Sequence, residues 1–538
     1  MNANIYDFII IGAGSAGSVL ANRLSADGRF SVLVVEAGRA SHPWSPIPVG
    51  FAKLIENPAA NWLYSSEPDE GSGQRRIPIP RGKLLGGSSS INGMVFVRGQ
   101  SHDFDHWAQL GNRGWSYQDV LPLFKKMESY EAGDDEFRGR DGPLKVTDPG
   151  EGGPIYDAMF EAAEQVGIKR NDDYNGAIQD GVGMTQATIR NGRRQSTAHC
   201  YLEPARERPN LTIVTDALTE KLLFEGTRCV GARYRVGGVV EEVRAAREVI
   251  VSAGAINSPQ LLELSGIGQP DLLRGHGIEP LHDLPGVGEN LRDHYAPRMK
   301  WTVSKPGLTY NDNGRGLALV WQALRYAVTR KGFLALPAAP MRAYVHSREG
   351  LESADLGISF NPYLIAEGVR LDKERGFTMI VHVLRSDSKG SIHVTSTDPS
   401  RPPAINFNFL SDENDRTALL SGMKIVRDWI NAPAMDDYRG VELAPGEALQ
   451  KDDELLDWVR QTAETTYHPV GTCKMGSDPM AVVDDQLRVH GIQGLRVADA
   501  SIMPTLTSGN TNAPSIMIGE KASTLVLAAA EETGAKAA

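Results

Sequence analysis

The chain has 538 residues, with a hydrophobic fraction of 41% and a charged fraction of 23%, which is the composition of an ordinary globular protein. Its length exceeds what one hydrophobic core serves, so we expect at least two packed regions. The formal net charge is −11, and acidic and basic residues are mixed along the chain. This distribution argues against a nucleic-acid partner, because phosphate binding needs a concentrated basic face.

The cysteines and the N-terminal residues indicate the cellular compartment in which the protein is expected. Cys200, Cys229 and Cys473 lie far apart and show no CxxC or zinc-type spacing, so we expect neither disulfides nor a metal site. The chain begins with an apolar strand and has no basic segment or cleavage site of a signal peptide. No apolar run approaches the ~20 residues that a membrane helix needs. These features predict a cytoplasmic protein.

A glycine loop lies between two predicted strands near the N-terminus. Residues 6–11 (YDFIII) are typical of a buried strand in a parallel sheet, and residues 12–17 (GAGSAG) then open a helical pattern. A second strand, residues 31–35, ends at Glu36. The order of strand, loop, helix, strand and acid predicts a dinucleotide site, which fits NAD and FAD equally.

Each residue of this pattern has a physical role. Gly12 permits the tight turn, and Gly14 lets backbone amides approach a pyrophosphate. Gly17 lets the helix lie close to the sheet, and Glu36 is placed to bind a ribose hydroxyl pair.

Two later segments are rich in small residues. Residues 81–99 (RGKLLGGSSSINGMVFVRG) combine glycines and serines with a dense apolar end, which favours a loop around a ligand over a flexible linker. Residues 254–268 (GAINSPQLLELSGIG) follow the predicted strand 248–252. They indicate another strand–helix unit of the same sheet.

These motifs resemble those of the glucose–methanol–choline (GMC) oxidoreductase family. Residues 81–92 match the first family signature, and residues 254–268 match the second. The runs 285–294 (PGVGENLRDH), 468–476 (HPVGTCKMG) and 497–522 are also similar to family elements. The similarity is closest to choline and alcohol dehydrogenases and spans almost the whole chain.

The resemblance implies an α/β fold. A doubly wound, Rossmann-like FAD-binding domain would be built from discontinuous segments, and an α+β substrate domain would carry an antiparallel sheet. The runs 377–384 and 391–394, polar at alternate positions, fit that sheet. The expected FAD-binding domain comprises residues 1–155, 196–300 and 466–538, and the expected substrate domain comprises residues 156–195 and 301–465.

The resemblance also implies how FAD is held. Some members attach FAD covalently through a histidine, where this chain has Ile91. Because Ile91 has no nucleophilic atom, we expect FAD to be bound non-covalently. The expected cofactor contacts are Gly12, Gly14, Ser15, Ala16, Gly17, Glu36, Ala37, Arg81, Gly86, Gly87, Ser90, Asn92, Gly93, Met94, Val95, Ala253, Asp499, Ala500, Asn510 and Thr511.

Alcohol oxidation by a flavin needs a base for the hydroxyl proton and a polar group that positions the oxygen. The family's pair is a histidine followed by a histidine or an asparagine. By resemblance the pair here is His468 and Asn512, which we expect to face the flavin. Asn510 is the alternative to Asn512, since one of the two asparagines can serve only to cap the following helix.

The expected partners are a small, primary alcohol and an electron acceptor. Thr466 and the run around His468 favour a dehydrogenase that reduces a quinone or another carrier over an oxidase that reduces oxygen. A flavin-containing lyase on the same scaffold remains a further alternative. A flavoprotein without catalytic activity is disfavoured, because both members of the pair are present.

Other substrate features stay open. Phe360, Tyr363 and Tyr467 are candidate walls of the substrate pocket. The apolar stretch 316–340 fits a lid, an oligomer contact or a peripheral membrane contact. A buried pair of helices is the favoured interpretation of that stretch.

Overall fold

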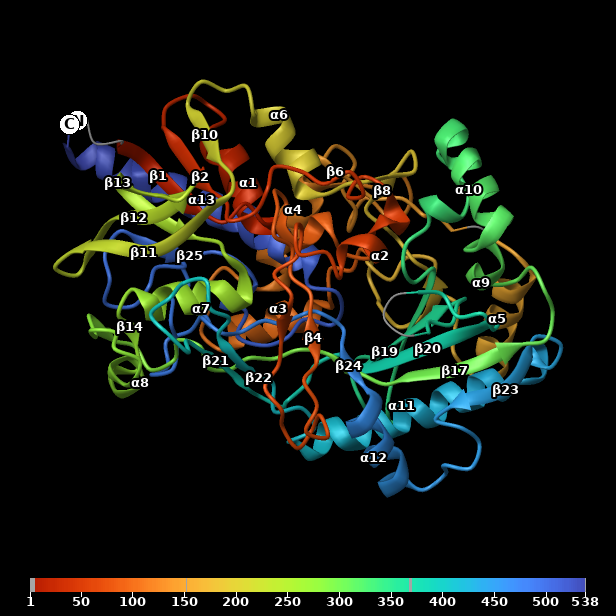
Figure 1. Cartoon of the computed structure of the whole chain (residues 1–538). Coiled ribbons are helices and arrows are strands. Elements are labelled where there is room, and N and C mark those ends of the chain that lie inside the picture. Colours follow the sequence, from red (N-terminus) through yellow and green to blue (C-terminus); the bar gives the residue numbers. More distant parts are fainter. Residues whose placement is uncertain (1–4, 151, 367–369, 538) are drawn as a thin grey trace.

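The computed structural model describes residues 5–150, 152–366 and 370–537. Two sheets organise these residues, one at the upper left and one at the lower right of Figure 1. Within the described residues, no helix combines the length and apolarity needed to cross a membrane.

The first sheet contains the predicted nucleotide-binding strands. Its order is β10-β2-β1-β13-β12-β11, and β25 pairs with β13. The pairs among β10, β2, β1, β13 and β25 are parallel, whereas β11 and β12 form an antiparallel extension. The strands are β1 (Ile5–Ile11), β2 (Val32–Val35), β10 (Leu211–Val214), β11 (Ala217–Glu225), β12 (Arg228–Val236), β13 (Val239–Val251) and β25 (Leu495–Val497).

Helices from both ends of the chain pack on this sheet. Helix α1 (Ser15–Leu24) lies beside α13 (Asn512–Ala537), and an ion pair of 2.7 Å joins Arg23 to the buried Glu520 between them. Helix α7 (Gly254–Leu264) follows β13. The doubly wound arrangement expected from the sequence is confirmed.

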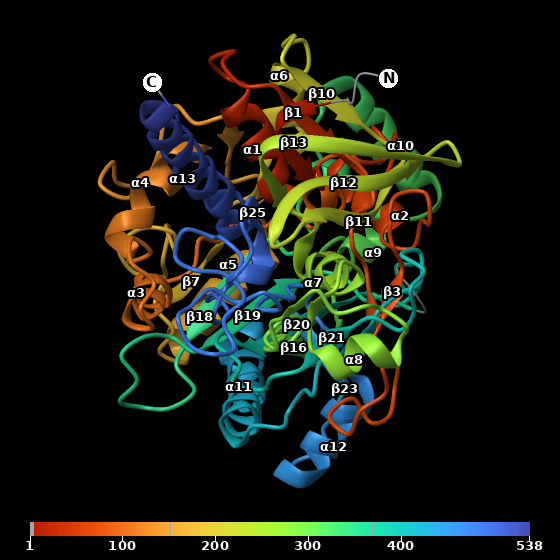
Figure 2. The same ribbon diagram turned by 90° about the vertical axis from the view of Figure 1, so that its left-hand side faces the viewer.

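The second sheet is antiparallel, in the order β23-β17-β20-β19-β18-β7. Helices α5 (Pro154–Gln165) and α11 (Glu413–Asn431) cover its apolar face, which is turned away from the first sheet (Figures 1 and 2). The predicted antiparallel sheet of the substrate domain is thus confirmed, while the exact domain boundaries stay a prediction. The strands are β7 (Gly181–Met184), β17 (Arg298–Val303), β18 (Met341–Val345), β19 (Leu356–Asn361), β20 (Gly376–Val383) and β23 (Arg439–Ala444).

One predicted strand belongs elsewhere. The run 377–384 coincides with β20, but 391–394 does not join the six-stranded sheet. Its strand, β21 (Ser391–His393), pairs with β22 (Ala404–Asn406) in a separate two-stranded sheet. Alternating polarity shows that a strand is half-buried but does not identify the sheet that it joins.

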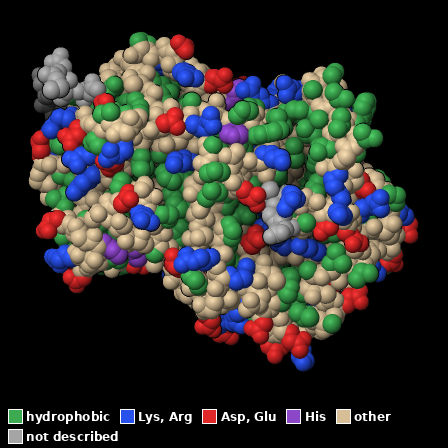
Figure 3. Space-filling model, viewed as in Figure 1, with side chains coloured by type: hydrophobic (Ala, Val, Ile, Leu, Met, Phe, Trp, Pro, Cys, Tyr) green, Lys and Arg blue, Asp and Glu red, His purple; other side chains and the backbone are tan. Residues whose placement is uncertain are grey.

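The favoured interpretation of the stretch 316–340 as a buried helix pair is wrong. Residues Gly316–Thr329 form α10, which projects from the molecule in Figure 1. Leu317, Trp321 and Val328 are 87%, 65% and 84% exposed, and an apolar surface is visible in this region of Figure 3. The other interpretations of this stretch stay predictions.

Shorter elements complete the fold. The remaining helices of six or more residues are α3 (Ser101–Gln109), α4 (Tyr117–Met127), α8 (Pro270–Gly275) and α12 (Asp452–Thr462).

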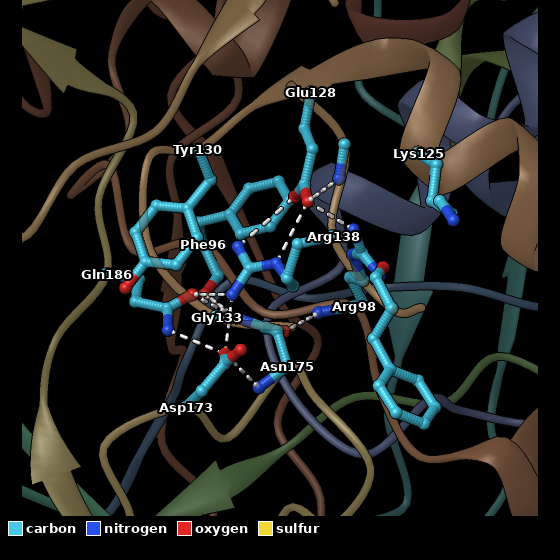
Figure 4. Close-up of polar contacts among 12 residues, drawn as sticks. Phe96, Arg98, Lys125, Glu128, Tyr130, Gly133, Arg138, Asp173, Asn175 and Gln186 are labelled. Carbon is cyan, nitrogen blue, oxygen red and sulfur yellow. Dashed lines mark hydrogen bonds and ion pairs between the residues drawn. The ribbon is translucent and has the colours of Figure 1, made fainter. Parts of the chain in front are cut away.

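A buried ionic cluster joins the end of the glycine- and serine-rich segment to the residues before the second sheet (Figure 4). Glu128 is fully buried and is paired with two buried arginines, Arg98 and Arg138. Arg138 also donates to Asp173 at 2.5 Å and to Gln186 at 2.9 Å. Because these charges are out of water, each depends on its partners for compensation.

Neutralising Glu128 should therefore destabilise the fold. We expect Glu128→Gln to lower the free energy of unfolding by about 3–5 kcal/mol, because two buried guanidinium groups lose their carboxylate. Thermal unfolding followed by circular dichroism measures the loss. Glu131→Gln is the matched control, since the Glu131 side chain is 82% exposed. Equal melting temperatures for the two variants would contradict this account.

Candidate active site

A cavity of about 1610 Å³ lies between the two sheets. Its walls come from the ends of β1 and β2, the glycine- and serine-rich segment, and one face of the second sheet. Pockets for one drug-sized ligand usually measure roughly 300–1,000 Å³. The volume therefore accommodates a dinucleotide cofactor and a small substrate together.

The glycine loop shapes one end of the cavity. A Cβ atom on Gly12, whose φ is +98°, would lie 2.5 Å from the carbonyl oxygen of Ser252. A Cβ on Gly17 would lie 2.0 Å from the carbonyl oxygen of Gly12, so α1 packs tightly on the loop. Gly14 caps α1 without a side-chain hydrogen bond, so amides of the first helical turn face the cavity. Such amides form an anion-binding site.

Glu36 lies at the same end, after β2. Its carboxylate accepts hydrogen bonds from the amides of Ala13, at 2.9 Å, and Gly38, at 2.7 Å. Burial raises the pKa of Glu36 to about 7. The side chain lines the cavity, where a ribose hydroxyl pair would satisfy its remaining lone pairs.

Most of the expected cofactor residues line this cavity, including the whole run 92–95. Gly17, Gly86 and Ser90 do not. Gly86 has a φ of +84°, and the Ser90 hydroxyl donates to the carbonyl of Leu85 at 2.7 Å. These residues shape the loops around the cavity without forming its surface.

In the structure the asparagine that contacts His468 is Asn510, the alternative to the expected Asn512. Asn510 Nδ2 lies 2.9 Å from His468 Nε2, and Asn510 Oδ1 is buried without a hydrogen-bond partner. Asn512 also lines the cavity, but its Oδ1 accepts a hydrogen bond from Ser15 at 2.8 Å. The reason is that α13 begins at Asn512, so the helix directs this side chain toward the start of α1.

A chain of hydrogen bonds determines the tautomer of His468. An amide NH₂ group can only donate, so His468 Nε2 accepts from Asn510. His468 Nδ1 therefore carries the proton and donates to His294 Nδ1 at 2.9 Å. His294 in turn donates through Nε2 to the carbonyl of Leu384 at 2.8 Å, because a carbonyl can only accept. The result is a basic nitrogen, Nε2, at the cavity wall.

Burial keeps both imidazoles neutral. It lowers the pKa of His294 to about 4 and the pKa of His468 well below its ordinary value, aided by the charges of Arg342 and Arg81. Thr466 Oγ1 lies 2.8 Å from His468 Nδ1 and can share its proton. His468 is thus a proton acceptor throughout the neutral pH range.

The backbone around His468 is held by charged side chains. Asp293 accepts from the amide of His468 at 2.9 Å, and burial raises the Asp293 pKa to about 6. Tyr467 has a φ of +70°, and Arg81 donates to its carbonyl at 2.5 Å. These contacts fix the direction of the imidazole.

The second sheet supplies a polar wall that the sequence analysis did not identify. Side chains alternate along its strands between the apolar core and the cavity. Tyr363 and Tyr467 line the cavity as expected, whereas Phe360 is wrong as a candidate wall because it lies in the core. The cavity face carries Arg298, Lys300, Arg342, Ser359, Asn361, Thr378, Ile380 and His382.

Two comparisons with known proteins identify the family. The GMC oxidoreductase profile matches residues 6–296 with its N-terminal part and residues 386–519 with its C-terminal part. The chain belongs to the GMC oxidoreductase family. An oxygen-dependent choline dehydrogenase of Brucella canis is 44% identical over 528 residues, which cover 97% of this chain and 95% of that protein. A protein of the same description from Rhizobium etli is also 44% identical.

Solved structures agree with this assignment. Pyridoxine 4-oxidase from Mesorbium loti superposes with a TM-score of 0.87 at 30% identity, covering 97% of this chain and 99% of that one. A variant of formate oxidase from Aspergillus oryzae has a TM-score of 0.91 at 26% identity, with coverages of 99% and 100%. The chain is an FAD-dependent oxidoreductase that acts on alcohols.

The residues present fit FAD. The open amides of α1 suit a pyrophosphate, Glu36 suits a ribose, and His468 and Asn510 line the same cavity. The cavity connects these features.

Glu36 provides a test of the nucleotide end. We expect Glu36→Ala to raise the dissociation constant of FAD by about tenfold or more, because charge-assisted hydrogen bonds to the ribose contribute about 1.5–3 kcal/mol. Quenching of flavin fluorescence, titrated into the FAD-free protein, gives this constant. Glu56→Ala, at an exposed position on the cavity rim, is the control. An unchanged constant in Glu36→Ala would show that the ribose binds elsewhere.

Proposed function

We propose that this protein is an FAD-dependent dehydrogenase that oxidises a primary alcohol to an aldehyde and passes the electrons to a quinone or another carrier. The observation that carries the proposal is the pair of polar atoms on the cavity wall, His468 Nε2 and Asn510 Nδ2, 2.9 Å apart. One atom is a base and the other is a donor. Both are required at the oxygen of an alcohol that is being oxidised.

The two residues divide the work. On binding, the substrate hydroxyl replaces the direct hydrogen bond between the two side chains: it donates to His468 Nε2 and accepts from Asn510 Nδ2, so its oxygen lies between the two groups. His468 takes the hydroxyl proton as the carbon loses a hydride, and the C–O bond becomes C=O. Asn510 stabilises the negative charge that develops on the oxygen during this step. When bound, FAD supplies the two-electron acceptor for the hydride.

Other residues have positioning roles in this proposal. His294 holds the proton of His468 on Nδ1, so that Nε2 is free to act as the base. Asn512 contacts Ser15 at the start of α1 and belongs to the cofactor end of the site. Thus Asn510 takes the catalytic role that the sequence favoured for Asn512.

FAD is bound non-covalently in this proposal. Ile91 is buried at the cavity wall, where a tethering histidine is expected in some relatives, and it offers no atom for attachment. The run 92–95 would contact the flavin. Gly12, Gly14 and Ser15 would contact the pyrophosphate.

Acid precipitation tests the absence of a covalent link. We expect denaturation of the yellow protein in trichloroacetic acid to release all of the flavin into the supernatant, because only non-covalent contacts retain it. Absorbance of the supernatant and of the redissolved pellet measures the partition. Yellow colour in a washed pellet would contradict the assignment, and free FAD added to apoprotein serves as the recovery control.

The acceptor distinguishes a dehydrogenase from an oxidase. Thr466 lies against His468, which supports the dehydrogenase. The curated relatives are called choline dehydrogenases but are described as oxygen-dependent, so their names do not favour a quinone over oxygen as the acceptor. Pyridoxine 4-oxidase and formate oxidase support the alternative on the same scaffold. These descriptions do not favour a lyase.

Three substitutions separate the roles of His468, Asn510 and Asn512. We expect His468→Ala to slow flavin reduction by roughly 10²–10⁴, because the base is lost. Asn510→Ala should slow it by about 10²–10³, because a preorganised donor is lost. Asn512→Ala should weaken FAD binding and leave the reduction rate of the FAD-saturated enzyme within a few fold of the native rate. Anaerobic stopped-flow absorbance at saturating alcohol measures all three rates.

The pH dependence is a second measurement in the same experiment. Since the pKa of His468 is lowered, its basic form is already present at neutral pH, and the native rate should be flat there and fall only on the acid side. His468→Ala should lose this acidic limb. A near-native rate of flavin reduction in His468→Ala would show that the base is another residue. A larger loss of that rate in Asn512→Ala than in Asn510→Ala would show that Asn512 is the partner of His468.

Admitting air after reduction then shows whether oxygen is an efficient acceptor.

A further inference from the structure

The cavity face of the second sheet carries more positive charge than its surroundings compensate. Arg342 on β18 is 5% exposed and lines the cavity. Its Nε donates to the hydroxyl of Tyr344 at 3.2 Å. Among the described residues, no carboxylate forms a salt bridge with Arg342, and its two terminal amino groups have no hydrogen-bond acceptor. A guanidinium with so little exposure and no counter-ion is costly, so an anion bound in the cavity would stabilise it.

The other charged residues of the cavity wall do not supply that anion. Lys300 on β17 lines the same wall, and burial together with the charge of Arg298 lowers its pKa. Arg298 already pairs with Glu464 at 2.6 Å. The other acidic residues of the cavity wall lie in other parts of the cavity. Glu36 and Asp499 lie at the nucleotide end, and Glu56 lies on the exposed rim.

His382 on β20 is a second unpartnered group on this wall. It is 3% exposed, and neither ring nitrogen has a hydrogen-bond partner. Its ring centroid lies 4.7 Å from that of His294, which contacts His468. Burial, together with the charge of Arg342, holds its pKa well below the ordinary value, so this imidazole is neutral and does not compensate Arg342. The unpartnered groups therefore lie beside the proposed catalytic base.

We propose that the substrate is an alcohol that also carries a carboxylate, which Arg342 binds while the hydroxyl lies between His468 and Asn510. This inference rests on the proposed function and names its substrate class. The planar guanidinium matches the two oxygens of a carboxylate, and Lys300, on β17 in the same sheet, adds positive charge to the same cavity wall. The same wall disfavours choline, because a quaternary ammonium would meet an uncompensated arginine in a buried pocket.

Matched substrate pairs test the class. One pair is 6-hydroxyhexanoate and 1-hexanol, another is 4-(hydroxymethyl)benzoate and benzyl alcohol, and choline is measured alongside. For each substrate we compare the flavin-reduction rate divided by the apparent dissociation constant. In at least one of the two pairs we expect this ratio to be at least about tenfold higher for the carboxylate than for its neutral partner. Choline should be the poorest substrate. Equal ratios within both pairs, or a preference for choline, would overturn the inference.

Variants connect the preference to Arg342. Arg342→Gln should raise the apparent dissociation constant of the carboxylate substrate about 10–100-fold and leave that of the neutral partner within about twofold. Arg342→Lys, which keeps the charge, should retain part of the preference. Arg348→Gln is the control, because Arg348 is exposed six residues further along the chain and does not line the cavity. A full preference in Arg342→Gln would overturn the assignment.

A binding measurement separates this inference from the proposed function. Hexanoate and benzoate have no hydroxyl, so their effect on the flavin absorbance reports binding without turnover. We expect both to bind the native holoenzyme and to bind Arg342→Gln about 10–100-fold more weakly. If no alcohol reduces the flavin, the proposed function fails, but this titration still decides whether Arg342 binds a carboxylate. If 6-hydroxyhexyl phosphate is preferred to 6-hydroxyhexanoate, the carboxylate assignment is overturned.

Discussion

The reactivity of this site depends on the direction of one chain of hydrogen bonds. The Leu384 carbonyl can only accept and the Asn510 amide nitrogen can only donate, so the two ends impose the same direction on His294 and His468. Neither imidazole can adopt the other tautomer without breaking a contact at one end. The basic nitrogen is therefore on Nε2 before any substrate arrives, and burial keeps it unprotonated. Preorganisation of this kind removes the cost of arranging the base during the reaction.

The architecture explains how these residues meet. His294 lies just before β17, and Leu384 follows β20, so both lie at the same end of these two paired antiparallel strands. Asn510 lies before α13, which packs on α1 beside the first sheet. The chain between His294 and His468 passes through most of the second sheet before it returns. Both sheets must fold and pack together before the base and its donor come within reach of each other.

The sequence predicted the unit of strand, glycine turn, helix and strand that brings Gly12 and Glu36 to the cavity, because this strict order leaves one arrangement for them. It did not decide between Asn510 and Asn512, since two residues of the same type two positions apart differ only in where α13 begins. The polar wall was missed for another reason. Arg342 and His382 alternate with apolar neighbours, but periodicity does not show which face meets a cavity and which meets solvent. The same limit explains the error for 316–340, where an apolar composition predicted burial and α10 is exposed.

The alternation along β17, β18 and β20 has a consequence for how this protein can change. Met341 and Ala343 belong to the core beneath α11, while Arg342 between them faces the cavity. Adjacent positions of one strand are thus under different constraints. The core-facing residues must pack against the apolar layer, and the cavity-facing residue must suit the ligand. A library restricted to the cavity-facing positions would alter charge and shape around the reacting alcohol and leave the apolar layer intact. New substrate specificities are accessible on this scaffold without redesign of its interior. The positions to vary are every second residue of each strand, on the face that lines the cavity.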